Sequence, residues 1–220
     1  MKDSKIVNKR NTTPVHPIGA TFFITCSLKG AIEENELLKI KEEYNNRIST
    51  IGHADTEELS NDRKYIASRK YLLDIDEKLN ANTGPTFLAS PEIARVLLAR
   101  IESYHMRYYK LLALSILPNH FHMLIDTSVQ IKEIYDPNTV PKNYVQLDKI
   151  ISLIKEGSAR YINHYCKIDE RQVWEDENFD TYIRDEKMLS SIINHIKTNP
   201  VKAGLVRSYE EHPFTFVNDL

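Results

Sequence analysis

The sequence has few cysteines and no long apolar run, and both absences narrow the class of protein. Its 220 residues include two cysteines, Cys26 and Cys166, too few for a disulfide framework and without the paired spacing of a zinc site. Nowhere do about 18 apolar residues follow one another, and the opening MKDSKIVNKRNTTPVHP contains no apolar core of a signal peptide. We therefore expect a cytoplasmic protein that is neither exported nor inserted in a membrane.

A large excess of positive charge is also missing. The formal net charge is −2 at pH 7, which argues against coating nucleic acid through bulk electrostatics, so any contact with DNA has to be local. The first ten residues do carry four basic side chains against one acidic one. This polar arm, residues 1–18, is either a segment that contacts phosphates or a solvated terminus.

Strands and helices are expected to share one core, because 41% of the residues are hydrophobic. Hydrophobic periodicity predicts strands at 20–27, 111–117, 120–126 and 179–184, and helices that begin at Pro91 and span 147–165 and 186–199. A charged stretch at about 32–82 predicts an inserted helical pair. The element order predicts an α+β fold, an antiparallel sheet with helices on one face. We expect one principal domain over residues 19–216, followed by a tail at 217–220.

Two histidines on one predicted strand carry the sharpest local signal. Successive strand side chains point to opposite faces, so His120 and His122 project to one side while Phe121 enters the core. Two neutral imidazoles at this spacing can ligate one divalent cation. Many such pairs are only surface or hydrogen-bonded histidines, so the pair alone is weak support for a metal site.

Three longer strings resemble, in the same order, three blocks of the REP-associated tyrosine transposases and of the related HUH single-strand transposases: LPNHFHMLI (117–125), VWEDENFDTYIRDEKML (173–189) and HIKTNPVKAGLV (195–206). The resemblance implies a ferredoxin-like fold, a Mg²⁺ or Mn²⁺ site, and nicking of single-stranded DNA beside a hairpin through a phosphotyrosine linkage. His120 and His122 match the two histidine ligands, and Asn199 matches the polar ligand, whose amide oxygen suits such a cation. The oligomeric state stays open.

The sequence departs from the family at two positions. The family's nucleophilic tyrosine lies four residues before the asparagine, and here that residue is His195; where the family usually has histidine, this chain has Tyr182. Three explanations compete. Tyr182 supplies the hydroxyl and His195 acts as a base; or His195 activates a water for hydrolysis; or cleavage is lost and DNA binding is kept.

Basic residues near the matching blocks are the candidates for phosphate contacts: Lys155, Arg160, Arg184 and Lys202. Lys155 and Arg160 fit a solvated helix face equally well. Trp174 is either a stacking surface for an unpaired base or a core residue. The leading hypothesis is a transposase-like endonuclease that acts on structured single-stranded DNA in transposition and recombination. The alternative is a domesticated DNA-binding protein that recognises hairpins and performs no chemistry.

Overall fold

The computed structural model describes residues 16–51, 56–131, 141–167 and 171–218, so most of the predicted N-terminal arm and the end of the tail lie outside it. Five strands and five α-helices follow one another along the described residues. They are β1 (Thr21–Ser27), α1 (Glu34–Ser49), α2 (Glu57–Asn80), α3 (Pro91–Glu102), β2 (Lys110–Ile116), β3 (His120–Asp126), α4 (Leu147–Cys166), β4 (Phe179–Tyr182), α5 (Glu186–Lys202) and β5 (Thr215–Val217).

The strands form one antiparallel sheet in the order β4-β1-β3-β2-β5. β1 and β3 are neighbours near its centre, and their register places Thr25 opposite His122 and Ser27 opposite His120. The predicted α+β class with an antiparallel sheet is confirmed, and the order of its first four strands, with α3 and α4 as the two crossing helices, is ferredoxin-like.

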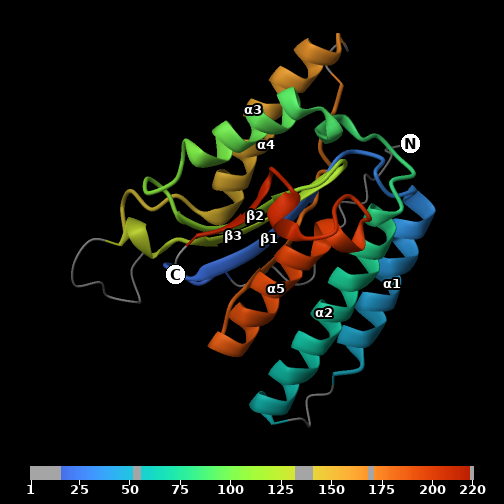
Figure 1. Ribbon diagram of the computed structural model, residues 1–220. Coiled ribbons are helices and arrows are strands. Elements are labelled where there is room, and N and C mark those ends of the chain that lie inside the picture. Colours follow the sequence, from blue (N-terminus) through green and yellow to red (C-terminus); the bar gives the residue numbers. More distant parts are fainter. Residues whose placement is uncertain (1–15, 52–55, 132–140, 168–170, 219–220) are drawn as a thin grey trace, which may run out of the picture.

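Helices cover both faces of the sheet, which corrects the prediction of helices on one face (Figure 1). One core lies between the sheet and α3 and α4, and a second joins the other face to α5 and α2. The reason is the two-sided character of the central strands: in β1 Phe22 and Ile24 face the first core while Phe23 faces the second. A strand buried on both sides needs a cover on both sides.

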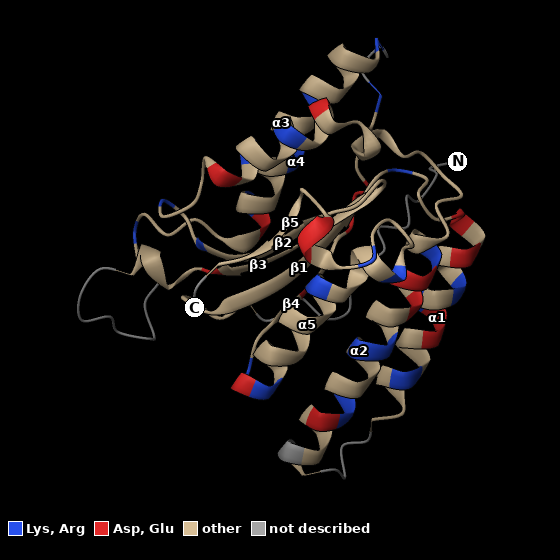
Figure 2. Cartoon of the chain, viewed as in Figure 1, with Lys and Arg blue, Asp and Glu red and all other residues tan. Residues whose placement is uncertain are grey.

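The predicted inserted helical pair is α1 and α2, which pack side by side (Figure 1). No described residue of α1 is buried, and both helices carry interspersed basic and acidic residues on their outer faces (Figure 2). α2 buries a stripe of apolar side chains, Leu72, Ile75 and Leu79, whose spacing is that of one helix face. That stripe fixes α2 beside the sheet.

The last helix continues past its predicted end. α5 reaches Lys202 and contains Pro200, because a proline this close to a helix end removes only one of the final hydrogen bonds. Gly204 follows with a φ of 70°, a conformation that glycine adopts without steric cost. The short edge strand β5 was not predicted. None of the described helices is long and apolar enough to cross a membrane.

Candidate metal centre and nucleic-acid site

The two histidines of β3 meet on the sheet face covered by α5. His120 and His122 are 1% and 0% exposed, and their Nε2 atoms lie 3.2 Å apart. Phe121, between them, points into the opposite core, where its ring meets the edge of Trp174. The strand alternation read from the sequence therefore holds.

Hydrogen bonds on the far side of each ring orient these imidazoles. His120 Nδ1 donates to Asn119 Oδ1 at 2.7 Å, and His122 Nδ1 is hydrogen-bonded to Thr25 Oγ1 at 2.8 Å. Such partners fix ring orientation and turn the second nitrogen toward a common point. Burial lowers the pKa of His120 to about 3 and the pKa of His122 well below its ordinary value, so both rings are neutral and keep lone pairs for a ligand.

A third group of the cluster comes from the insert and was missed in the sequence. Asp76 of α2 is buried, with Oδ1 3.6 Å from His122 Nε2 and Oδ2 2.7 Å from His195 Nε2. One ligand atom from each of Asp76, His120 and His122 lies within 4.8 Å of the others. The available signal was position: Asp76 falls four residues after Leu72 and three before Leu79, in the middle of a buried apolar stripe.

The carboxylate of Asp76 lacks the partners that a buried charge requires. Among the described residues neither of its oxygens has a hydrogen bond, and the close approach to His195 does not have hydrogen-bond alignment. Burial raises the pKa of Asp76, and the neighbouring His195 and Lys202 oppose that rise. A buried, unsatisfied carboxylate beside two neutral imidazoles offers ligand atoms that could hold a divalent cation.

Asn199 completes the cluster from α5. It is buried, its Nδ2 lies beside His122 Nε2, and its Oδ1 accepts a hydrogen bond from Asn80 Nδ2 at 2.9 Å. Asn80 Oδ1 is itself buried without a hydrogen bond among the described residues. A half turn of both amides would present Asn199 Oδ1 to the cluster and satisfy Asn80 Oδ1, so the predicted ligand fits the donor set.

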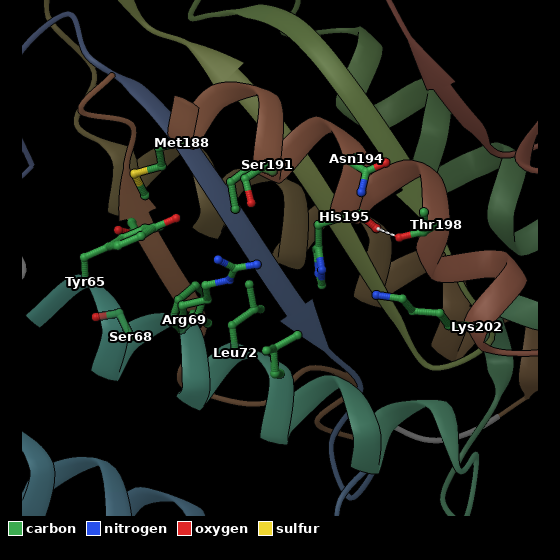
Figure 3. A pocket seen from close by; sticks show the side chains of 14 residues that line it. Tyr65, Ser68, Arg69, Leu72, Met188, Ser191, Asn194, His195, Thr198 and Lys202 are labelled. Atoms are coloured by element: carbon green, nitrogen blue, oxygen red, sulfur yellow. Dashed lines mark hydrogen bonds between the residues drawn. The ribbon is translucent and has the colours of Figure 1, made fainter. Parts of the chain in front are cut away.

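His195 lies one helical turn before Asn199 on the same face of α5, as the spacing predicted. Its ring contacts His122 and Phe23, with centroids 5.3 Å and 5.7 Å away. It also lines a cavity between α2 and α5 (Figure 3). His195 therefore connects the buried cluster to the surface.

Tyr182 lies on the other side of the sheet from His120 and His122. It pairs with Phe22 and packs against the core beneath α3 and α4, whereas Phe179 packs in the core that contains Phe23. Because successive strand residues alternate, a tyrosine at 182 cannot face the histidines while Phe179 does.

The predicted DNA contacts separate into two groups. Trp174 is 4% exposed and donates from Nε1 to Ser158 Oγ, so it is a core residue, and the stacking prediction is corrected. Lys155 and Arg160 belong to α4, which covers the face opposite the histidines. Lys155 donates to the main-chain carbonyl of Glu175, a structural contact.

Arg184 and Lys202 lie on the same side as the cluster. The Arg184 guanidinium sits 5.1 Å from the ring centroid of Tyr65, and both Tyr65 and Lys202 line the cavity between α2 and α5. Of the four predicted basic residues, these two therefore lie on the side of the histidines.

Comparison with known proteins identifies relatives of one kind. No protein-family model matches the chain. The chain is 28% identical over 107 residues to a Haemophilus influenzae protein whose name places it among the REP-associated tyrosine transposases; the match covers 49% of this chain and 58% of that protein. A solved structure of a REP-associated tyrosine transposase bound to a REP hairpin aligns with 94% of this chain and 82% of its own, at 15% identity and a TM-score of 0.48. The resemblance predicted from the three sequence blocks is confirmed: the chain is similar to a protein named as a REP-associated tyrosine transposase.

Proposed function

We propose that this protein binds structured, hairpin-bearing single-stranded DNA and cleaves it hydrolytically with the help of a divalent cation. The observation that carries the proposal is the Asp76 carboxylate, buried with no hydrogen bond among the described residues and aimed at His122 and His195. The similarity to a REP-associated tyrosine transposase supports single-stranded DNA as the substrate class. The match spans 58% of the curated relative, so its activity is carried over here as a proposal.

Asp76, His120, His122 and Asn199 would hold the cation. Carboxylate and amide oxygens suit Mg²⁺ and Mn²⁺, and the two imidazoles favour Mn²⁺ of the pair. When bound, the cation supplies Lewis-acid polarisation of a phosphodiester oxygen. Thr25 and Asn119 keep the two rings in the orientation that this binding requires.

His195 takes the role of general base. A water oxygen attacks phosphorus and loses a proton to His195, and the bond from phosphorus to one sugar oxygen breaks. That oxygen takes up a proton from solvent, and the protonated His195 returns its proton to solvent, which gives one phosphate end and one hydroxyl end. Asp76 Oδ2, 2.7 Å from His195 Nε2, stabilises the protonated ring. No protein–DNA linkage forms, because the family's tyrosine is absent from position 195 and Tyr182 lies across the sheet.

Binding without cleavage is the second candidate, and a specific feature favours it. The imidazoles of His120 and His122 are essentially unexposed, and the cluster includes a carboxylate from the inserted α2. A phosphodiester would reach the cluster only past His195. If α2 stays fixed, the protein recognises DNA and performs no chemistry on it.

Cleavage of a labelled hairpin-bearing single strand in Mn²⁺ separates the two. Denaturing gels score cut strands and covalently attached protein, for the wild type, for His195→Ala and for His120→Ala, with Tyr182→Phe as the matched control. We expect free cut strands without adduct, lost in both histidine variants and kept in Tyr182→Phe. An adduct in the wild type would contradict hydrolysis, and binding without a cut strand would establish the second candidate.

A further inference from the structure

The cavity between α2 and α5 faces the cluster from outside and is called here the α2–α5 cavity. Two helix faces line it at matching intervals: Tyr65, Arg69 and Leu72 from α2, and Ser191, His195 and Thr198 from α5. Its volume is about 110 Å³. A cavity of this size has room for a small polar group such as a phosphate.

The lining selects for negative charge. No aspartate or glutamate of the described chain lines the α2–α5 cavity, while Arg69 and Lys202 both do. Neither cation forms an ion pair with a described residue. Ser68, Ser191 and Asn194 add hydroxyl and amide groups that can donate hydrogen bonds. An anion with several acceptor oxygens matches this set.

The two cations lie on either side of the way to His195. In Figure 3 the Arg69 guanidinium extends from α2 toward α5, and the Lys202 ammonium extends toward His195 from the end of α5. Arg184, stacked over Tyr65, continues the positive charge from the α2 side of the cavity. A single strand laid along the α2–α5 cavity would therefore meet successive positive side chains before its phosphate reaches His195.

We propose that the α2–α5 cavity is a phosphodiester-binding site for single-stranded DNA, in which Arg69 of the insert and Lys202 of α5 hold a phosphate next to the one at His195. The inference rests on the proposed function and goes beyond it, because it assigns the inserted helix α2 a direct contact with substrate. Such contacts position the strand and carry no sequence information, so the site accepts DNA of any sequence.

The test is the salt dependence of binding, measured by fluorescence anisotropy with a labelled hairpin-bearing single strand in chelator, where no cleavage occurs. The double variant Arg69→Gln, Lys202→Gln is compared with Lys64→Gln, Lys187→Gln, which removes the same charge from the same two helices outside the cavity. Each phosphate contact adds about 0.7 to the slope of log affinity against log salt for single strands. We expect the cavity variant to lose a slope of about 1.4 from two such contacts, with several-fold weaker binding at every sequence tested.

The possible outcomes distinguish failure of the cavity site from failure of the proposed function. Equal slopes for the cavity and control variants, with tight wild-type binding, would overturn the cavity site and leave the proposed function standing. Absence of wild-type binding to any single strand would overturn both. An RNA strand of the same sequence serves as competitor, and preference for RNA would also overturn the assignment to DNA. Unchanged thermal unfolding of each variant shows that the effect is not loss of fold.

Discussion

Two cavities flank α2, and they differ in size and in charge. The α2–α5 cavity measures about 110 Å³ and has no carboxylate among the described residues that line it. The second, between α1, α2 and the segment before β4, measures about 460 Å³; we call it the α1–α2 cavity. Five acidic residues line it: Glu33, Glu34, Glu175, Asp176 and Glu177. The larger cavity would repel a phosphate backbone, so the smaller one is the better candidate for DNA.

The contrast shows how a chain of net charge −2 can still bind a polyanion. Two of the lysines at the α1–α2 cavity already have acidic partners: Lys29 meets Glu175 at 2.9 Å and Lys41 meets Glu177 at 2.6 Å. Arg69 and Lys202, across α2, have none among the described residues. Local charge, rather than the total, decides where a strand of DNA can lie.

The largest expected effect is on the free energy of unfolding, when the packing of α2, the helix between the two cavities, is weakened. Leu72 of α2 is 3% exposed and packs against α5, whereas its neighbour Leu73 is 42% exposed. Leu72→Ala should lower the free energy of unfolding by about 2–5 kcal/mol, because a buried leucine leaves a cavity behind. Leu73→Ala, the matched control, should stay within about 0.5 kcal/mol. Denaturant unfolding measures both, and equal costs would show that α2 is not anchored through this stripe.

Replacing Asp76 should change the free energy of unfolding relative to the wild type, in a direction that depends on whether the metal is present. In chelator at pH 8, Asp76→Asn should raise the free energy of unfolding by about 1–3 kcal/mol, because a buried carboxylate without hydrogen bonds carries a desolvation penalty. With Mn²⁺ added, the wild type should gain stability by mass action and Asp76→Asn should gain none.

Thermal unfolding with and without Mn²⁺ gives both readings. Glu77→Gln, the next residue along α2 and solvent-exposed, is the control that removes one charge outside the cluster. A metal-induced shift retained by Asp76→Asn would exclude the carboxylate as a ligand, and with it the link between the insert and the cluster.

The sequence predicted the sheet and half of the site for identifiable reasons. His120 and His122 were predicted to share one face because strand alternation is local, whereas Asn199 and His195 were assigned from the resemblance to the transposase family. Asp76 was missed because it reaches β3 only when the inserted helices fold back against the sheet. Local periodicity gives no information about such a long-range contact. The sequence alone did not fix whether Tyr182 reaches the histidines, and the pairing of β4 with β1 puts it on the other face of the sheet.

The positions of the helices on the two faces of the sheet were harder to predict than the strands. Burial on both faces of β1 is compatible with a short apolar run, but nothing in that run says which helix lies on which side. The domain limits at 19–216 stay a prediction.

A smaller effect is expected at β4, whose residues Phe179 and Thr181 line the α2–α5 cavity while Asp180 hydrogen-bonds elsewhere. His16 Nε2 lies 2.6 Å from Asp180 Oδ2, and this hydrogen bond raises the pKa of His16 above its ordinary 6.5. The pair therefore stabilises the fold fully below pH 6.5, and the contribution is lost as pH rises through the raised pKa.

His16→Gln should thus cost less than about 1 kcal/mol at pH 5.5 and less still at pH 8.5. Denaturant unfolding at the two pH values checks the trend, and His212→Gln, whose pKa is lowered by burial, serves as a histidine control. A cost that grows with pH would contradict the pairing.

The smallest expected effect is a change in the salt slope of DNA binding, and it distinguishes the two cavities most directly. Lys41→Gln removes one positive charge from the α1–α2 cavity, as Lys202→Gln does from the α2–α5 cavity. Because Lys41 is paired with Glu177 among other carboxylates, its loss should leave the salt slope of DNA binding unchanged. Lys202→Gln alone should lower that slope by about 0.7. Equal slopes in the two variants would mean that DNA responds to the charge of the whole protein, and the distinction between the two sides of α2 would then not describe how the protein binds.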